Sequence, residues 1–334
     1  MNPHVSPQEG DGQPSPTEDM APIHAVKTQA STPKLYLVAS GGAMRGFFNL
    51  GVMQEVWQKT QDGQLPPVER FYTASVGVTT ALGYLHPEGP LKMGRAYLDM
   101  VALKGKVFTK FIDRRRVWKI ADIDYLVDEV VLPNFPMNDQ TFARTEVMVS
   151  VMDAKTGDIT YHRLTHQNIR PLLRATMSAP IMYNKPVLYE GRRVVDAAIA
   201  ESAPLLEQIA YRERTGHQAV TGLILTRGLD EVTNNAKIPE RVLRHIWPLR
   251  GQVKHAVRNL APWRDVKTLE LARAGRTSDG LPIVVTTPDP QFRTLSATET
   301  NALKLGAFLM HGEQKSKAFA DELAYQLQQL ASNE

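Results

Sequence analysis

Two strand–loop–helix units follow one another near the start of the chain, and they constrain the fold more than any other feature of the sequence. Each unit begins with a short apolar run, at residues 34–39 and 70–74, of the kind that forms a strand covered on both faces. A turn follows each run, and apolar residues at helical spacing come next, as with Phe47, Leu50 and Met53. Alternating strands and helices predict a three-layer α/β/α fold with a mostly parallel central sheet.

The rest of the chain continues this pattern. Residues 147–152 and 159–162 predict the two strands of a hairpin, joined by a polar turn. Buried strands are expected at 220–226 and 283–287, and residues 239–274 have a helical pattern broken near Pro248 and Pro262. A long helix ends the chain, with one apolar stripe made by Phe319, Leu323, Leu327 and Leu330.

Length and composition bound the domain organisation. With 334 residues, 43% of them hydrophobic, the chain can bury one large core. Residues 1–33 are rich in proline and polar side chains, so we expect a disordered tail before Lys34. The absence of cysteine excludes disulfides and thiolate chemistry. There is no apolar run of membrane-spanning length and no secretory signal, so we expect a cytoplasmic protein.

The charge pattern bears on partners. A net charge of +4 favours anionic partners without identifying one. Basic residues alternate with aromatic and aliphatic ones at 104–119 and 241–258, which is typical of a face that rests on anionic headgroups, although a solvated helix face has the same pattern. We therefore expect peripheral contact with an anionic membrane surface. No nucleic-acid-reading motif accompanies the charge, so no nucleic acid partner is expected.

The loop after the first strand has the glycine pattern of an anion-binding turn. Gly41 and Gly42 lack a Cβ atom, so their N–H groups can converge on one small space, and Arg45 adds a cation or braces the loop. A phosphate-binding P-loop is excluded because Phe47 stands where a lysine is required. A dinucleotide fingerprint fits poorly because Ala43 blocks close approach of a pyrophosphate. An ordinary tight turn remains an alternative.

The second unit carries a candidate nucleophile. Ser75 lies where a strand turns into a helix, which would hold its hydroxyl clear of the backbone near the positive end of that helix. Gly77 suits such a nucleophile elbow because a small residue lets helix and strand approach closely. Thr73 departs from the glycine usual at the first position of the elbow, so this motif is weak by itself.

A third segment makes the combination specific. Residues 174–180 lead into Asp196-Ala197-Ala198, and Pro204 follows eight residues after Asp196. Together with the glycine loop and Ser75, in this order, the segment resembles the patatin-like phospholipase family. The family pattern is a G-G-G-x-R-G loop, a G-x-S-x-G elbow and a D-G-G or D-G-A motif followed by proline. The resemblance extends over residues 34–228.

The resemblance implies a fold, an activity and roles for residues. The fold would be the patatin-like α/β/α sandwich, with a catalytic domain at 34–228 and a helical extension at 229–334 packing on the same domain, as in a bacterial subgroup. Ser75 would be the nucleophile and Asp196 its only partner, in a dyad without histidine. Gly41, Gly42 and Ala43 would donate N–H groups to an oxyanion, beside Arg45. The substrate would be a lipid acyl ester, hydrolysed as by a phospholipase A or a lysophospholipase, with no metal and no cofactor.

A Ser-Asp dyad requires Asp196 to be a stronger base than an ordinary aspartate. An aspartate with an ordinary pKa, about 3.9, is a feeble base, so the dyad depends on desolvation of Asp196 and a short hydrogen bond to Ser75. A turn aspartate exposed to solvent is the plain alternative for Asp196.

The departures from the family pattern leave other functions open. Ala43, Thr73 and the pair Ala197-Ala198 each add a Cβ where the family has glycine. We therefore expect either a slow or narrowly specific hydrolase, or a catalytically inactive protein that binds lipid or regulates on the same fold. A further alternative is an α/β-hydrolase esterase with a triad of Ser75, Asp196 and His311, although His311 falls in a predicted helix rather than a loop.

Overall fold

The structure is a computed structural model that describes residues 32–104, 121–135, 140–180, 182–183, 186–230 and 261–332. Side chains are described from 32 to 100 in the first range and from 263 in the last. The predicted tail lies outside the described residues except for Thr32 and Pro33. The basic stretches at 104–119 and 241–258 also lie outside the described residues, except for the backbone of Lys104. So does the part of the helix predicted at 239–274 that precedes Ala261.

The described residues form one mixed sheet of eight strands. Its order is β5-β6-β3-β2-β1-β7-β8, and β4 pairs with β3 off this path. Neighbours among β1, β2, β3, β7 and β8 pair in parallel, whereas β4, β5 and β6 form the antiparallel pairs. The strands are β1 (Lys34–Ala39), β2 (Val68–Ala74), β3 (Glu146–Asp153), β4 (Ile159–Arg163), β5 (Val187–Tyr189), β6 (Arg192–Asp196), β7 (Ala219–Ile224) and β8 (Ile283–Thr286).

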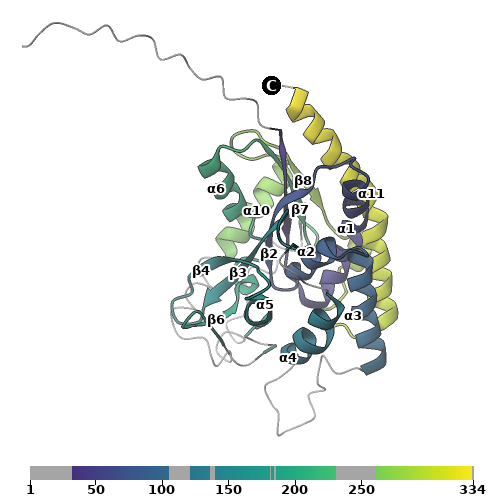
Figure 1. The fold of residues 1–334 in the computed structure, drawn as a ribbon, viewed down its shortest axis with the longest axis vertical. Helices are drawn as coiled ribbons and strands as arrows, with labels where there is room; N and C mark the ends of the chain where they lie inside the picture. Colours follow the sequence, from purple (N-terminus) through teal and green to yellow (C-terminus); the bar gives the residue numbers. More distant parts are fainter. Residues whose placement is uncertain are drawn as a thin grey trace, which may run out of the picture. The chain divides into compact units, whose positions relative to one another are not determined.

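Helices cover both faces of the sheet (Figure 1), which confirms the predicted three-layer α/β/α fold. One face packs against α1 (Gly46–Gln61), α2 (Gly77–Leu85), α3 (Pro90–Lys104) and α11 (Ala302–Ser332). The other packs against α6 (Leu205–Thr215) and α10 (Ala261–Ala274). Shorter elements are α4 (Ile123–Tyr125), α5 (Ile169–Met177), the π-helix η2 (Leu126–Val131) and the 3₁₀ turns η1 (Ala43–Arg45), η3 (Leu132–Asn134), η4 (Ala197–Ile199) and η5 (Pro290–Phe292).

The alternation of side chains along β1 divides the core into these two layers. Leu35 and Leu37 lie in the cluster shared with α1 and α11, whereas Val38 lies in the cluster shared with α6 and α10. All three are fully buried, as expected of a strand whose successive side chains point to opposite covered faces. The continuous apolar run that predicted this strand is therefore explained by burial on both sides.

One strand is shorter than predicted, one predicted hairpin is confirmed and one hairpin was not predicted. The strand expected at 220–226 is β7, which ends at Ile224, because the Thr226 N–H leaves the sheet and donates to Ser40 Oγ at 2.9 Å. The 147–152 and 159–162 segments form the predicted antiparallel hairpin as β3 and β4. The short β5–β6 hairpin was not predicted as strands.

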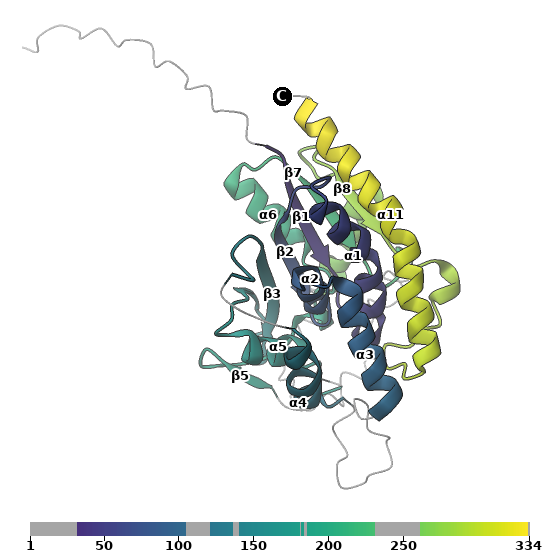
Figure 2. The same cartoon turned by 45° about the vertical axis from the view of Figure 1, so that its right-hand side comes forward.

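The last helix lies against α1 in both views (Figures 1 and 2). The backbones touch at a glycine crossing: a Cβ on Gly312 would lie 2.2 Å from the Phe48 carbonyl oxygen, and one on Gly51 would lie 2.1 Å from the Leu309 carbonyl oxygen. The predicted stripe of α11 is buried at Phe319, Leu323 and Leu327 and half-buried at Leu330. Among the described helices none has the length and apolar character needed to cross a bilayer.

Candidate active site

The register of the sheet brings Ser75 and Asp196 together. Ala74 at the end of β2 pairs with Ser150 of β3, and Asp196 at the end of β6 pairs with the next residue, Val151. A strand has two edges, and β4 pairs with both Ser150 and Val151 along one edge of β3. Strands β2 and β6 must therefore both lie along the other edge. These two strands therefore meet end to end, and the residue after Ala74 is Ser75.

Ser75 occupies a strained turn between β2 and α2. Its φ is 52°, in the left-handed region that L-residues other than glycine rarely adopt. The Ser75 N–H donates to Thr176 Oγ1 at 3.0 Å, and Thr176 Oγ1 donates in turn to the Ser150 carbonyl at 3.0 Å. Thr176 therefore ties the strained turn to β3.

The neighbours of Ser75 in the elbow fit the turn. A Cβ on Gly77 would lie 2.3 Å from the Ala39 carbonyl oxygen, so only glycine permits the close approach of α2 to β1. Thr73 is fully buried, and its hydroxyl donates to the Met148 carbonyl at 3.1 Å. Its β-branched side chain thus lies against β3.

The Asp196 carboxyl group is buried and directed at Ser75. It is 2% exposed, and its Oδ1 accepts the Ala198 N–H at 2.8 Å. Burial raises the pKa of Asp196 to about 7, although the nearby Ser75 side chain and the bond from Ala198 act in the opposite direction. A carboxylate with this pKa is a far better base near neutral pH than a solvated aspartate.

The glycine loop presents two free N–H groups beside this pair. Within the described residues, the N–H groups of Gly42 and Ala43 have no acceptor, while the other polar groups from Ser40 to Gly42 and the N–H of Met44 are engaged. Those bonds are Ser40 N–H to Ile224 O, Asn49 Nδ2 to Ser40 O, Gly41 N–H to Ser202 O, Thr226 Oγ1 to Gly41 O, Arg45 N–H to Gly42 O and Met44 N–H to Ala297 O. Adjacent unpaired donors of this kind are what an oxyanion requires.

The structure also places Gly41 and Ala43, two of the residues predicted to form the oxyanion loop. The Gly41 N–H, which the sequence also predicted as an oxyanion donor, donates instead to Ser202 O at 2.8 Å. Gly41 makes room: a Cβ there would lie 2.8 Å from Ala198 Cβ and 3.0 Å from Ser75 Cβ, so the loop, the elbow and the Asp196 segment meet at this point. Ala43 has a φ of 50°, so its Cβ does carry the strain expected from replacing a glycine.

Arg45 and the two alanines after Asp196 are also placed by the structure. Arg45 Nε donates to the Leu295 carbonyl at 2.8 Å, which braces the loop from the segment before α11. Ala197 and Ala198 lie in the η4 turn, and neither has a positive φ, so replacing glycine there imposes no backbone strain. Ala198 instead supplies the N–H that Asp196 accepts.

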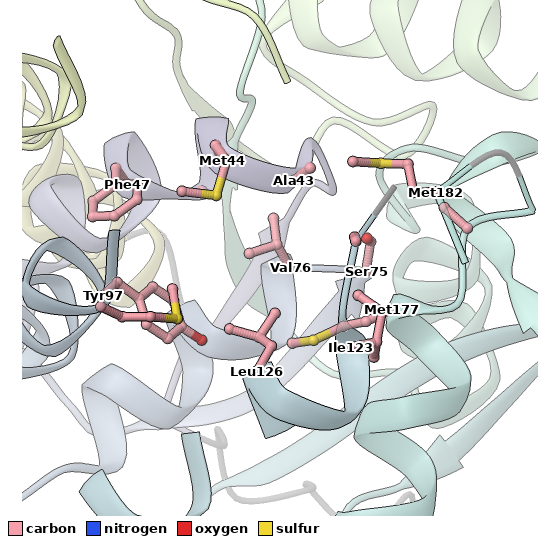
Figure 3. A pocket seen from close by; sticks show the side chains of 14 residues that line it. Ala43, Met44, Phe47, Ser75, Val76, Tyr97, Ile123, Leu126, Met177 and Met182 are labelled. Carbon is pink, nitrogen blue, oxygen red and sulfur yellow. The ribbon is translucent and has the colours of Figure 1, made fainter. Parts of the chain in front are cut away.

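An apolar cavity opens beside Ser75 (Figure 3). In this view Ser75, Ala43 and Met182 lie toward one end of the lining, and Phe47 and Tyr97 lie toward the other. Apart from the Ser75 and Tyr97 hydroxyls, the lining side chains are hydrocarbon or thioether. The lining residues are Ala43, Met44, Gly46, Phe47, Ser75, Val76, Tyr97, Met100, Ala121, Ile123, Leu126, Met177, Ala179 and Met182.

The histidine of the alternative triad has other partners. His311 Nε2 accepts the Asp289 N–H at 3.1 Å, and its ring stacks on Phe292. It is 4% exposed within α11 and does not line the cavity beside Ser75. Where the structure describes the chain, no three side chains of the kind that bind metals are grouped as a site for an ion.

The sequence reasoning missed Thr176, Thr226 and Ser202, which hold the elbow and the loop. Thr176 stands in the quoted 174–180 segment, but nothing in its spacing indicated a bond to Ser75. Thr226 and Ser202 reach Gly41 only because β7 and the segment after η4 lie beside the loop in the folded chain. No local pattern could have revealed these contacts.

Comparisons with known proteins place the chain in a family. A family model of the patatin-like phospholipases matches residues 37–209, more than half of the chain. The uncharacterized protein YjjU of Escherichia coli (strain K12) is 24% identical over 190 residues, covering 54% of this chain and 50% of YjjU, so the chain matches about half the length of that relative. The crystal structure of VipD from Legionella pneumophila aligns over 87% of this chain and 67% of VipD, with a TM-score of 0.39 and 10% identity. On the family match, the chain belongs to the patatin-like phospholipase family.

Proposed function

We propose that this protein is a lipid acyl hydrolase in which Ser75 is the nucleophile and Asp196 the general base. The observation that carries the proposal is the position of Ser75 beside the buried carboxyl group of Asp196, whose pKa is raised to about 7. A serine hydroxyl becomes nucleophilic only when a base accepts its proton. The strained turn and the apolar cavity beside Ser75 support the same role.

The residues suggest a two-step reaction. Asp196 accepts the Ser75 proton as the oxygen attacks the ester carbonyl, and the resulting oxyanion lies against the N–H groups of Gly42 and Ala43. Collapse breaks the ester bond, and the alcohol leaves with the proton held by Asp196. Water then attacks the acyl-serine as Asp196 accepts a proton from it; the bond between the acyl carbon and Ser75 Oγ breaks, Ser75 takes the proton back from Asp196, and the free carboxylic acid departs.

The lining of the cavity favours an acyl chain as the group bound beside Ser75. Four methionines line it, Met44, Met100, Met177 and Met182, and their flexible side chains adapt to chains of different shape. An apolar chain would displace water from this cavity, which lowers the dielectric around the reacting ester. We accordingly propose phospholipids or lysophospholipids as substrates and peripheral contact with the membrane that holds them.

Active-site labelling tests the assignment of Ser75. A fluorophosphonate probe should form an adduct on Ser75 in the native protein, and Ser75→Ala and Asp196→Asn should abolish or greatly slow the labelling. Ser316→Ala is a matched control, because Ser316 is also buried but its hydroxyl bonds only to the Glu313 carbonyl of its own helix. This control should label as fast as the native protein.

Release of fatty acid from vesicles tests the substrate class. Hydrolysis should be measured on phosphatidylcholine vesicles with and without phosphatidylglycerol, since a basic protein at the surface should act faster on the anionic vesicles. Binding to vesicles without labelling or hydrolysis would instead favour the inactive lipid-binding protein. Labelling of another serine would contradict the proposed nucleophile.

A further inference from the structure

We propose that Thr226 is a positioning residue that holds the Gly41–Gly42 peptide in the orientation needed for an oxyanion hole; this inference rests on the proposed function. Thr226 Oγ1 donates to the Gly41 carbonyl at 2.6 Å. Because a trans peptide directs its C=O and N–H to opposite sides, a fixed Gly41 carbonyl also fixes the direction of the Gly42 N–H. That N–H is one of the two loop donors without an acceptor in the described chain.

The Gly41–Gly42 peptide needs such a restraint more than its neighbours. It is flanked by two glycines, so rotation of its plane meets no Cβ on either side and few conformations are excluded. Gly42 has a φ of 156° and contacts Thr226 closely: a Cβ there would lie 2.4 Å from Thr226 Oγ1. A flipped peptide would place a carbonyl where the oxyanion forms and would remove a donor.

Thr226 is itself held in place. It is 4% exposed, and its N–H donates to Ser40 Oγ at 2.9 Å. Its hydroxyl is therefore presented to Gly41 by two residues that leave neighbouring strands at the same edge of the sheet, Ser40 after β1 and Thr226 after β7. Thr226 lies beyond the residues that the family model matches.

The other side of Gly41 has a separate support. The Gly41 N–H donates to the Ser202 carbonyl, and Ser202 is held by Asp265 of α10, whose Oδ1 accepts the Ser202 hydroxyl at 2.9 Å and its N–H at 3.2 Å. Gly41 is thus fixed through its N–H by Ser202 and through its C=O by Thr226. Among the bonds of the described residues, the Thr226 contact is the one that acts on the peptide carrying the Gly42 donor.

The test compares Thr226→Val with Thr226→Ser. Valine keeps the shape of threonine without the hydroxyl, so kcat for a soluble acyl ester should fall by about 10- to 100-fold, less than the loss of an entire oxyanion donor. KM should change little, because the peptide acts on the transition state. Thr226→Ser keeps the hydroxyl, so its kcat should match that of the native protein. Thr221→Val is the matched control: Thr221 is a buried threonine of β7 whose hydroxyl donates to Gln208 Oε1 at 3.1 Å, and its variant should keep native kcat.

A crystal structure of Thr226→Val gives a readout that does not depend on activity. It should show the Gly41–Gly42 peptide flipped or in two orientations, whereas the native protein shows one. Native kcat together with an unchanged peptide in Thr226→Val would overturn the inference while leaving the Ser75 proposal intact. Failure of the native protein to label at Ser75 would overturn the proposed function, and the peptide orientation would still decide whether Thr226 holds the loop.

Discussion

The carboxyl group of Asp196 is buried but has polar neighbours in Ser75 and the Ala198 N–H, and the balance between these effects sets the pH at which it can act as a base. Burial disfavours its charged form and raises its pKa to about 7. The Ser75 side chain and the Ala198 N–H favour the charged form and limit the rise. The result is a carboxylate that is available at neutral pH and still basic enough to accept a serine proton.

The pH dependence of the reaction should report this group. In the proposed mechanism only the ionised form of Asp196 works, so kcat/KM should rise with pH, reach half of its maximum near pH 7 and fall about tenfold per unit well below it. Initial rates on a soluble ester from about pH 5 to 9 would show the profile. A rate independent of pH over this range would argue against Asp196 as the base.

The same burial predicts a cost to stability. Since the pKa of Asp196 is higher in the folded state than in the unfolded chain, the folded protein binds its proton more tightly, and stability is lost as pH rises from about 4 to 7. Asp196→Asn keeps the shape without the charge, so it should be more stable than the native protein at pH 8, by up to about 4 kcal/mol, and similar at pH 4. Urea unfolding at both pH values measures this, and a less stable variant at pH 8 would contradict it.

At the level of residues, the sequence predicted those parts of the site that belong to short motifs. Ser75 and Asp196 stand in recognisable patterns, and the structure places them side by side. Ala43, Ala197 and Ala198 all replace family glycines, but only Ala43 has a positive φ, since Ala197 and Ala198 form a 3₁₀ turn. The supports Thr176 and Thr226 could not be predicted, because each role depends on a contact between residues far apart in the chain.

At the level of elements, the central strands were predictable because burial on both faces requires uninterrupted apolar runs. The β1, β2, β3 and β8 segments match their predicted ranges within two residues. The β5–β6 hairpin was missed because it is short and Arg192 and Arg193 are exposed, so it lacks an apolar run. Yet β6 is the strand that ends in Asp196 and places it beside the end of β2.

The crossing of α1 and α11 allows a paired test on one helix. Gly312→Ala would place a methyl group 2.2 Å from the Phe48 carbonyl oxygen, so the helices must separate, at a cost of about 1–3 kcal/mol or more. Gly306→Ala, six residues earlier in α11, would meet only Leu98 Cδ1 at 3.9 Å and should stabilise the helix by about 0.5–1 kcal/mol. Thermal unfolding of both variants measures the difference, and equal melting temperatures would contradict the tight crossing.

At the level of the whole molecule, the glycine loop depends on residues well outside the matched family region. The Leu295 carbonyl accepts Arg45 Nε, the Ala297 carbonyl accepts the Met44 N–H, and Thr226 donates to Gly41. Each of these supports comes from β7 or from the chain after it, whereas the loop follows the first strand. Leu295 and Ala297 lie in the predicted extension at 229–334, so the glycine loop of the predicted catalytic domain makes hydrogen bonds to that extension.

A chain ending at residue 228 should consequently fail to fold. It would lack β8 and α11, and α11 alone buries six large apolar side chains, Leu305, Phe308, Leu309, Phe319, Leu323 and Leu327. Each contributes about 1.5–3 kcal/mol when fully buried, so together they are comparable to the whole stability of a typical domain, about 5–15 kcal/mol. Removing them would also expose the apolar faces of α1 and β7, so we expect an insoluble or protease-sensitive product without cooperative unfolding and without labelling at Ser75. The opposite outcome is a fragment that unfolds cooperatively and reacts with the fluorophosphonate at the native rate. It would show that residues 34–228 form an independent catalytic domain. The contacts of the loop with Leu295 and Ala297 would then not be needed for its function.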